Sequence, residues 1–399
     1  MEKVAIIGTA GLPSRYGGFE TLVQNLVIHW KGKFDIYVYC SNKFYKKEER
    51  VKYYEGARLF YLPLNANGGQ SILYDIISIF HALFYADTLL VLGISGCILI
   101  PLIRLFTNKK IIVNIDGLEW KRQKWNKVIR RYLKLSEYLG VKFSHADIAD
   151  NASIKKYTAI NYNTLSFQIE YGGDHAAYVK PEIEDLEKFP FLKDNYCFKV
   201  CRIEPENNVH VILEAFSRIN NKKIVLVGNW ENSEYGKELK MKYSKFSNIL
   251  IFDPIYHQRS LDLLRSNCSI YIHGHSAGGT NPSLVEAMFL GLPVIAFNVS
   301  YNISTTLNKA FYFKREDDLV ELLNSLDEEH LFSVKTEMKR IADEKYTWSI
   351  IAEKYANLIY TFGYNYVKKP VKTSIASLKV KELSRSGVSH MKNTRSFFE

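Results

Sequence analysis

The stretch GHSAGGTNPSLVEAMFLG, residues 274–291, decides the fold of this chain. A short run of β-branched and aromatic residues, 269–273, precedes it, and an apolar pattern typical of a helix follows over residues 284–289. The turn between them is rich in glycine and ends in Asn281, a strong helix N-cap, and Pro282, the residue favoured at the first helical position. The sequence therefore predicts a strand, a glycine turn and a capped helix.

A helix that starts in this way has free backbone N–H groups and a positive dipole end, and both favour a bound anion such as phosphate. We expect that anion to lie against the four turn residues Gly278, Gly279, Thr280 and Asn281. Glu286 follows five residues past the cap. The spacing from Ser283 to Glu286 also fits a capping box, which would give Glu286 a structural role instead.

Strand-like and helix-like segments alternate along the whole chain, which predicts doubly wound parallel sheets. In the first half the expected strands are 4–8, 35–40, 57–62, 89–93, 111–115, 146–149 and 165–171. The pattern restarts after residue 173, with expected strands 197–201, 224–228, 249–252, 269–273 and 293–297. The sequence thus predicts an α/β protein of two Rossmann-like domains that face each other across a cleft.

The expected domain boundaries follow from this alternation and from changes in composition. We expect a first domain over 1–171, a second over 172–344 and a last helix within 345–366. The charged segment 181–190 is bounded by prolines and is typical of a linker. The Lys- and Ser-rich tail 367–399 has little periodicity and is expected to be disordered.

The formal charge of +11 is concentrated in two segments. Residues 104–142 hold eleven bases against three acids, and the tail after Tyr366 holds eight bases against two acids. Such segments favour an anionic partner: nucleic acid, an anionic membrane or a phosphorylated substrate. Residues 120–143 interleave aromatic residues with bases, as in elements that lie on an anionic bilayer. A solvated basic helix and an RNA-binding surface are the alternatives, and no recognised nucleic-acid motif supports the latter.

Several features bear on the cellular setting. The five cysteines form no C-x-x-C pair, which favours a reducing cytosol. No secretory signal is visible, and the longest uncharged run, 88–103, is too short and too interrupted to cross a membrane. His273 and His275 have no nearby carboxylate or thiol partners in the sequence, so we expect no bound metal.

Two loops of the first domain hold candidate contacts. Gly17 and Gly18 stand where the first helix begins, and glycine there lets a ligand approach the backbone. Asp116 and Glu119 follow an apolar strand, whose carboxyl end faces the ligand crevice of an open α/β sheet. Either acid is a candidate to bind an acceptor hydroxyl or to act as a base. A flexible loop for the glycines, and an Asp-Gly turn for Asp116, are the structural alternatives.

Arg202 lies just past the first strand of the second domain. Its planar guanidinium is suited to holding a diphosphate at that edge. The alternative is an ordinary surface ion pair with Glu204 or Glu206.

Taken together, these motifs resemble a retaining GT-B glycosyltransferase of the family with an E-x7-E signature. The resemblance covers residues 1–362, and within the family the chain looks like the bacterial β-1,4-rhamnosyltransferase branch. The family resemblance is carried by RIEPE at 202–206, PSLVEAM at 282–288 and YTW at 346–348, and the branch resemblance by RYGGFET at 15–21, DGLEWKR at 116–122 and HSAGGTNPS at 275–283. The resemblance implies that the closing helix within 345–366 packs back on the first domain. It implies transfer of rhamnose from dTDP-rhamnose to a lipid-diphosphate-linked saccharide, in synthesis of capsule or cell-wall polysaccharide.

The resemblance also implies roles for individual residues and for partners. Asp116, Arg202 and Glu286 are expected to be catalytic. The expected substrate contacts are Gly17, Gly18, Glu20, Glu119, Asn207, Asn208, His275, Gly278, Gly279, Thr280, Asn281 and Ser283. The partners are a dTDP- or other nucleotide-sugar donor, a polyprenyl-diphosphate-linked acceptor and an anionic membrane surface, with no cofactor, metal or nucleic acid. The expected location is cytoplasmic, peripheral on the inner face of a bacterial plasma membrane.

This chain departs from the wider family at two positions. The first Glu of the E-x7-E signature falls at Gly278, and the family's diphosphate-binding Lys falls at Asn207. Arg202 and the glycine turn must then hold more of the diphosphate charge. A non-hydrolysing sugar-nucleotide 2-epimerase, which needs no acceptor, and a non-enzymatic protein that binds anionic surfaces are the rival functions.

Overall fold

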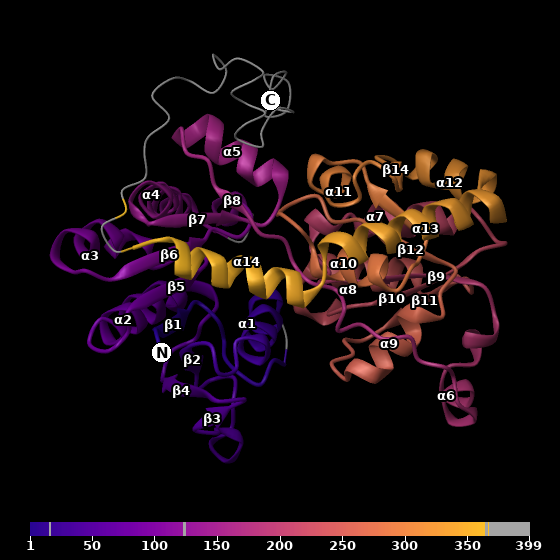
Figure 1. Ribbon diagram of the computed structural model, residues 1–399. Helices are drawn as coiled ribbons and strands as arrows, with labels where there is room; N and C mark the ends of the chain where they lie inside the picture. The colour runs from indigo at the N-terminus through magenta and orange to yellow at the C-terminus, as the bar shows by residue number, and fades with distance from the viewer. Residues whose placement is uncertain (16, 123–124, 364–365, 367–399) are drawn as a thin grey trace. The chain divides into compact units, whose positions relative to one another are not determined.

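The computed structural model describes residues 1–15, 17–122, 125–363 and 366 (Figure 1). The chain divides into two compact units. The first comprises Met1–Glu170 together with the described residues from Trp348 onward, and the second comprises Tyr171–Thr347. The predicted tail, 367–399, lies outside the described residues.

The first unit is built on one sheet, which has eight strands among the described residues. Their order is β3 (Tyr53–Tyr54), β4 (Ala57–Leu62), β2 (Asp35–Ser41), β1 (Lys3–Ile7), β5 (Thr88–Leu92), β6 (Lys110–Asn114), β7 (Ala146–Ala149) and β8 (Phe167–Gln168). All neighbours pair in parallel except β3 and β4. The central strands are continuous apolar runs because helices cover both faces of a parallel sheet.

The helices of the first unit lie on opposite faces of this sheet. They are α1 (Gly18–His29), α2 (Ser71–Ala82), α3 (Ile100–Phe106), α4 (Lys127–Phe143), α5 (Ala152–Tyr162) and α14 (Trp348–Thr361). The connections through α2, α3, α4 and α5 all run toward β8, opposite to the connection through α1. Since parallel crossovers are right-handed, these four helices share one face and α1 lies on the other.

The last helix, α14, packs beside α1 and closes the first unit. The indole Nε1 of Trp30, at the end of α1, donates to the carbonyl of Ala352, at 3.0 Å. The Asn114 side-chain amide donates to the Tyr355 hydroxyl at 2.6 Å, and Lys354 pairs with Glu170 at 2.6 Å. Residues far apart in the sequence are therefore joined in one core.

All residues of the second unit are described, and its sheet has six parallel strands. Their order is β11 (Ile249–Phe252), β10 (Lys223–Val227), β9 (Tyr196–Val200), β12 (Ile270–His273), β13 (Val294–Phe297) and β14 (Phe311–Phe313). The helices are α6 (Ile183–Lys188), α7 (Val209–Ser217), α8 (Glu234–Tyr243), α9 (Gln258–Ser266), α10 (Pro282–Phe289), α11 (Ser300–Thr305), α12 (Glu316–Ser325) and α13 (Glu328–Lys345). The predicted doubly wound α/β class is confirmed in both units.

Two expectations differ from the structure. The strand expected over 165–171 is reduced to β8, because it is an edge strand paired only with β7 and the chain leaves the first unit after Glu170. The segment 181–190, expected to be a linker, contains α6. Asp185 of α6 binds Arg259 of α9 through two hydrogen bonds of 3.0 and 2.9 Å, which fixes the segment on the second unit.

Candidate functional site

The candidate site of the second unit lies in the loops that follow β9 and β12. These strands are parallel neighbours, and the order of the sheet reverses between them, since the chain continues outward to β10 on one side and to β13 on the other. In open α/β sheets ligands bind outside the carboxyl ends of strands at such a reversal point. The glycine turn and Arg202 both lie at this edge.

Hydrogen bonds tie the two loops together. The Asn207 side-chain oxygen lies 2.7 Å from His275 Nδ1, and the Asn208 amide donates to the Gly274 carbonyl at 2.8 Å. Asn207 also donates to the carbonyl of Arg202 at 2.8 Å. The structure thus brings together four predicted residues, Arg202, Asn207, Asn208 and His275, in one bonded group.

The loops approach so closely that only glycine fits at residue 274. A Cβ added to Gly274 would lie 2.3 Å from the backbone oxygen of Asn207. Gly278 has a φ of +114°, a conformation open to glycine, and a Cβ there would lie 3.2 Å from His275 Nε2. A glutamate at 278, as in the wider family's signature, would therefore be strained in this turn.

Asn281 is the N-cap of α10, as the sequence predicts. Its side-chain oxygen accepts from the backbone N–H of Ser283 at 3.1 Å and from the Ser283 hydroxyl at 2.7 Å. Asn281, and not Ser283, caps the helix, so the capping-box alternative for Glu286 is wrong. The side chain of Glu286 is left for other contacts.

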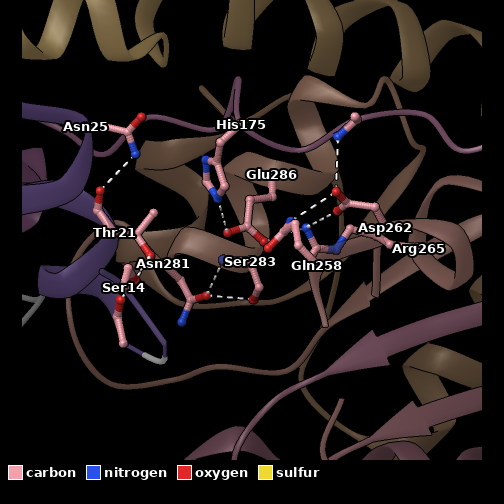
Figure 2. A network of polar contacts seen from close by, with 12 residues as sticks. Ser14, Thr21, Asn25, His175, Gln258, Asp262, Arg265, Asn281, Ser283 and Glu286 are labelled. Atoms are coloured by element: carbon pink, nitrogen blue, oxygen red, sulfur yellow. Dashed lines mark hydrogen bonds and ion pairs between the residues drawn. The ribbon is translucent and has the colours of Figure 1, made fainter. Parts of the chain in front are cut away.

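Glu286 lies between His175 and Arg265, as Figure 2 shows. Its Oε2 is 2.5 Å from Nη1 of Arg265, whose side chain is 1% exposed, and its Oε1 is 3.1 Å from Nε2 of His175. Burial alone would raise the pKa of Glu286, but the charge of Arg265 and the imidazole of His175 outweigh it and hold the pKa at about 2. Glu286 is therefore an anchored carboxylate.

The sequence interpretation missed Arg265, His175 and Asp262. Asp262 lies one helical turn before Arg265 on α9, with Oδ1 3.8 Å from Arg265 Nη1, and its Oδ2 accepts from the Gln258 amide at 3.0 Å. The only sequence signal for the pair of Asp262 and Arg265 was their spacing of three residues within the Leu-rich segment 261–265. That spacing is common on exposed helices and does not reveal burial.

Arg202 is one-third exposed, and its side chain forms an ion pair with Glu204 at 3.5 Å. Both the surface-pair alternative and a diphosphate-binding role are compatible with this geometry, because a long exposed pair is weak and readily exchanged.

Among the described residues, no group of three or more His, Cys, Asp and Glu side chains is arranged to hold a metal ion. The predicted lack of a metal stays a prediction.

In the first unit, the loop between β1 and α1 is held by its own acid. Glu20 is buried, and its Oε1 accepts from the Thr9 hydroxyl at 3.1 Å and from the Ala10 N–H at 2.6 Å. The other oxygen, Oε2, lies against the backbone of Gly17, which has a φ of +120°. Only glycine fits at this position, because a Cβ there would lie 2.0 Å from Oε2. These contacts make Glu20 a loop-organising residue, while Gly17 and Gly18 form the start of α1. Tyr16 lies outside the described residues.

Asp116 and Glu119 also have local structural contacts. Asp116 has a φ of +59°, and its N–H donates to the Asn114 side chain at 2.9 Å, as expected of a turn before Gly117. Glu119 binds the Trp125 indole at 3.0 Å and pairs with Arg122 at 2.9 Å. The turn alternative for Asp116 is thereby favoured, and its catalytic role stays a prediction.

Both units share their fold with known proteins. Their Rossmann-like parallel sheets match the layout of solved GT-B glycosyltransferase structures. Residues 182–343, which lie within the second unit, match the family described as glycosyl transferases group 1. Residues 1–174 match a family described as a domain of unknown function, DUF1972.

Solved structures share the fold over most of the chain. Sucrose-phosphate synthase from Thermosynechococcus elongatus matches with a TM-score of 0.75 and 14% identity, over 90% of this chain and 99% of that one. HepE from Anabaena in complex with UDP and glucose matches with a TM-score of 0.71 and 14% identity, over 91% and 100%. Protein CapJ of Staphylococcus aureus is 27% identical over 121 residues, 29% of this chain, so the chain spans about a third (30%) of that curated relative's length.

Proposed function

We propose that the protein transfers a sugar from a nucleoside-diphosphate donor to a hydroxyl group of an acceptor. The observation that carries this proposal is the bonded pair of loops after β9 and β12, which ends in the capped helix α10. It lies within the glycosyl transferases group 1 domain, and the structurally similar HepE holds UDP and glucose.

In this proposal the second unit stabilises the departing diphosphate. The acceptor oxygen bonds to the sugar's anomeric carbon as the bond from that carbon to the diphosphate oxygen breaks. Negative charge develops on the departing oxygen, which takes up the proton of the acceptor hydroxyl. Arg202 and the N–H groups around Gly278, Gly279 and Thr280 then stabilise this charge, because fixed donors aimed at developing charge lower the barrier. Glu286 hydrogen-bonds the sugar of the nucleotide, since a carboxylate held by Arg265 and His175 still has lone pairs to offer.

We further propose that the transferred sugar is L-rhamnose from dTDP-rhamnose, that the anomeric configuration is retained, and that the acceptor is a lipid-diphosphate-linked saccharide in capsule or cell-wall synthesis. Asp116 of the first unit would face the acceptor hydroxyl. The motifs at 15–21, 116–122 and 275–283 support these details through their resemblance to rhamnosyltransferases. The net charge of +11 supports an anionic membrane as the place where the acceptor is met.

A panel of sugar nucleotides tests the sugar donor first. A ligand that binds the native state raises the melting temperature, so the true donor should shift it most. The selected sugar nucleotide is then incubated with and without a polyprenyl-diphosphate-linked acceptor. We expect nucleoside diphosphate to be released only with the acceptor; conversion of the sugar nucleotide without acceptor would indicate the epimerase, and no turnover a binding protein.

A further inference from the structure

The first unit exposes a group of large apolar side chains on neighbouring helices. The exposed fractions range from 50% to 87%, and the residues are Leu73, Phe80, Phe84, Leu102, Leu105 and Phe106. We call this group the α2–α3 surface. Scattered single apolar residues are normal on a protein surface, but a cluster of this kind marks an interaction site.

The sequence of α2 shows that the exposure is a regular stripe. Leu73, Ile77 and Phe80 follow one another at intervals of four and three residues along one side of α2, and Phe84 lies in the turn just after the helix ends at Ala82. The opposite side, with Tyr74 and Ile79, is buried against the sheet. Helix α2 therefore has an exposed apolar side in addition to the buried side that contacts the core.

The fold places α2 and α3 beside the most basic helix of the unit. A Cβ on Gly96 would lie 2.8 Å from Ile79 of α2, and a Cβ on Gly140 of α4 would lie 3.0 Å from Cys97, three residues before α3. Helices α3 and α4 are also in contact, and Figure 1 shows all three helices in the first unit. Helix α4, which is in contact with α3, exposes Lys127 and Arg131 in its first two turns.

The acids of α2 and α4 are buried and add no exposed negative charge. They are Asp75 and Glu137, and α3 has no acid; Asp87, after α2, is exposed and accepts the Lys3 N–H at 2.9 Å. The aromatic residues expected to face a bilayer from 120–143 are partly used inside the fold. The Tyr132 hydroxyl donates to the Ser95 carbonyl at 2.7 Å, and Lys134 lies 4.7 Å from the centre of the Trp120 ring. Residues 123–124 lie outside the described part of the chain.

We propose that the α2–α3 surface inserts its apolar side chains into an anionic lipid bilayer, while the bases of α4 contact the headgroups. This inference rests on the proposed function, in which the acceptor is anchored in a membrane. Apolar residues beside Lys and Arg match the layers of an anionic bilayer: acyl chains below and negative headgroups above. A second copy of the chain would bring like charges together and is the less favourable occupant.

The test compares two double variants of the full-length protein. Phe80→Gln with Phe84→Gln removes apolar contact from the α2–α3 surface. Met241→Gln with Phe332→Gln is the matched control, because those side chains are 80% and 69% exposed on the second unit. Binding is measured by co-sedimentation with phosphatidylcholine–phosphatidylglycerol vesicles. We expect the first variant to bind about tenfold more weakly and the control to bind as the wild type does.

A second arm tests the charge. Lys127→Gln with Arg131→Gln should weaken binding to the same vesicles about tenfold, and wild-type binding should fall with added salt and with phosphatidylcholine alone. Unchanged binding of the Phe80/Phe84 variant, or a wild-type dimer that this variant turns into a monomer, would overturn the proposal. The melting shift with the sugar donor is measured in parallel: its absence in the wild type would overturn the proposed function and leave the vesicle result standing.

Discussion

Arg265 is a buried cation whose partners come from separate parts of the second unit. It lies 2.5 Å from Glu286 and 3.8 Å from Asp262, and its side chain is 1% exposed. Removing one member of a buried charged group leaves the others uncompensated, at a cost of about 3–5 kcal/mol. Glu286 therefore has a structural role in addition to the one proposed in binding, and Glu286→Ala is expected to weaken the fold.

Arg265→Leu should lower the free energy of unfolding by about 3–5 kcal/mol, because the carboxylates of Glu286 and Asp262 lose their cation. Urea unfolding measures the change. Arg259→Leu, on the same helix, removes a guanidinium that is 42% exposed and pairs with Asp185, and should cost only about 1 kcal/mol because that charge is partly solvated. Equal costs for the two variants would contradict the buried-pair interpretation.

Acid should weaken the native state partly through Glu286. Its folded pKa, about 2, lies below the ordinary value of 4.5, so the ionised group stabilises the fold above pH 4.5 and that contribution is lost as the pH falls toward 2. The lost amount is about 3 kcal/mol from the size of the shift. Urea titrations across this pH range should show a steeper loss for the wild type than for Glu286→Gln; parallel curves would argue against the depressed pKa.

Arg202→Ala should leave the fold intact and reduce sugar transfer sharply. The residue is one-third exposed and contributes only a long ion pair with Glu204 to stability. Arg218→Ala, which removes an exposed arginine paired with Glu214, is the control for loss of charge. The melting temperature of both should stay near the wild type, and only Arg202→Ala should lose the shift with the sugar donor. A normal transfer rate in Arg202→Ala would refute its assignment.

At the level of single residues, sequence reasoning succeeded where the cause was local. Asn281 caps its helix because an Asn followed by Pro has that preference in the chain itself. The partners of Glu286 could not be predicted in this way. His175 and Arg265 lie 111 and 21 residues away from it, and only the folded second unit brings them to the same carboxylate.

At the level of elements, the loops after β9 and β12 depend on their contact at Gly274. Gly274→Ala places a Cβ 2.3 Å from the backbone of Asn207, so the loops must separate. We expect this variant to lose donor binding and to melt at a lower temperature. Gly69→Ala meets no atom within 4 Å and should behave as the wild type in both measurements. Full donor binding by Gly274→Ala would show that the loop contact is dispensable.

Strand length decided which strands could be predicted. Among the described residues, each strand of four or more residues was expected, and 57–62, 146–149 and 249–252 were predicted with the bounds of β4, β7 and β11. The edge strands β3 and β14 were not expected, because an edge strand is short and its pairing depends on a neighbour. Helix α6 was missed because its contact with Arg259 is not local.

At the level of the whole molecule, the alternation of strands and helices was sufficient to predict two doubly wound units. The first unit is discontinuous, because α14 returns to it after the second unit. The alternation does not indicate this return, which was expected only from the family resemblance. Trp30 binds Ala352 across 322 positions of sequence, and no local pattern encodes such a pair.

Removal of the residues after Tyr366 should reduce membrane association more than turnover. The removed segment carries eight bases and two acids, and each base near an anionic surface contributes about 1 kcal/mol. Co-sedimentation with phosphatidylglycerol vesicles and transfer to a water-soluble acceptor are measured on the same preparation. Unchanged sedimentation of the shortened chain would contradict the prediction.

The buried contact between Arg265 and Glu286 also has a consequence for inheritance. Replacement of only one of these two residues leaves an unbalanced charge inside the second unit. We therefore expect that proteins which have lost one of them have also replaced the other. Relatives of this protein should therefore keep arginine and glutamate together or replace both, with Asp262 following the same history.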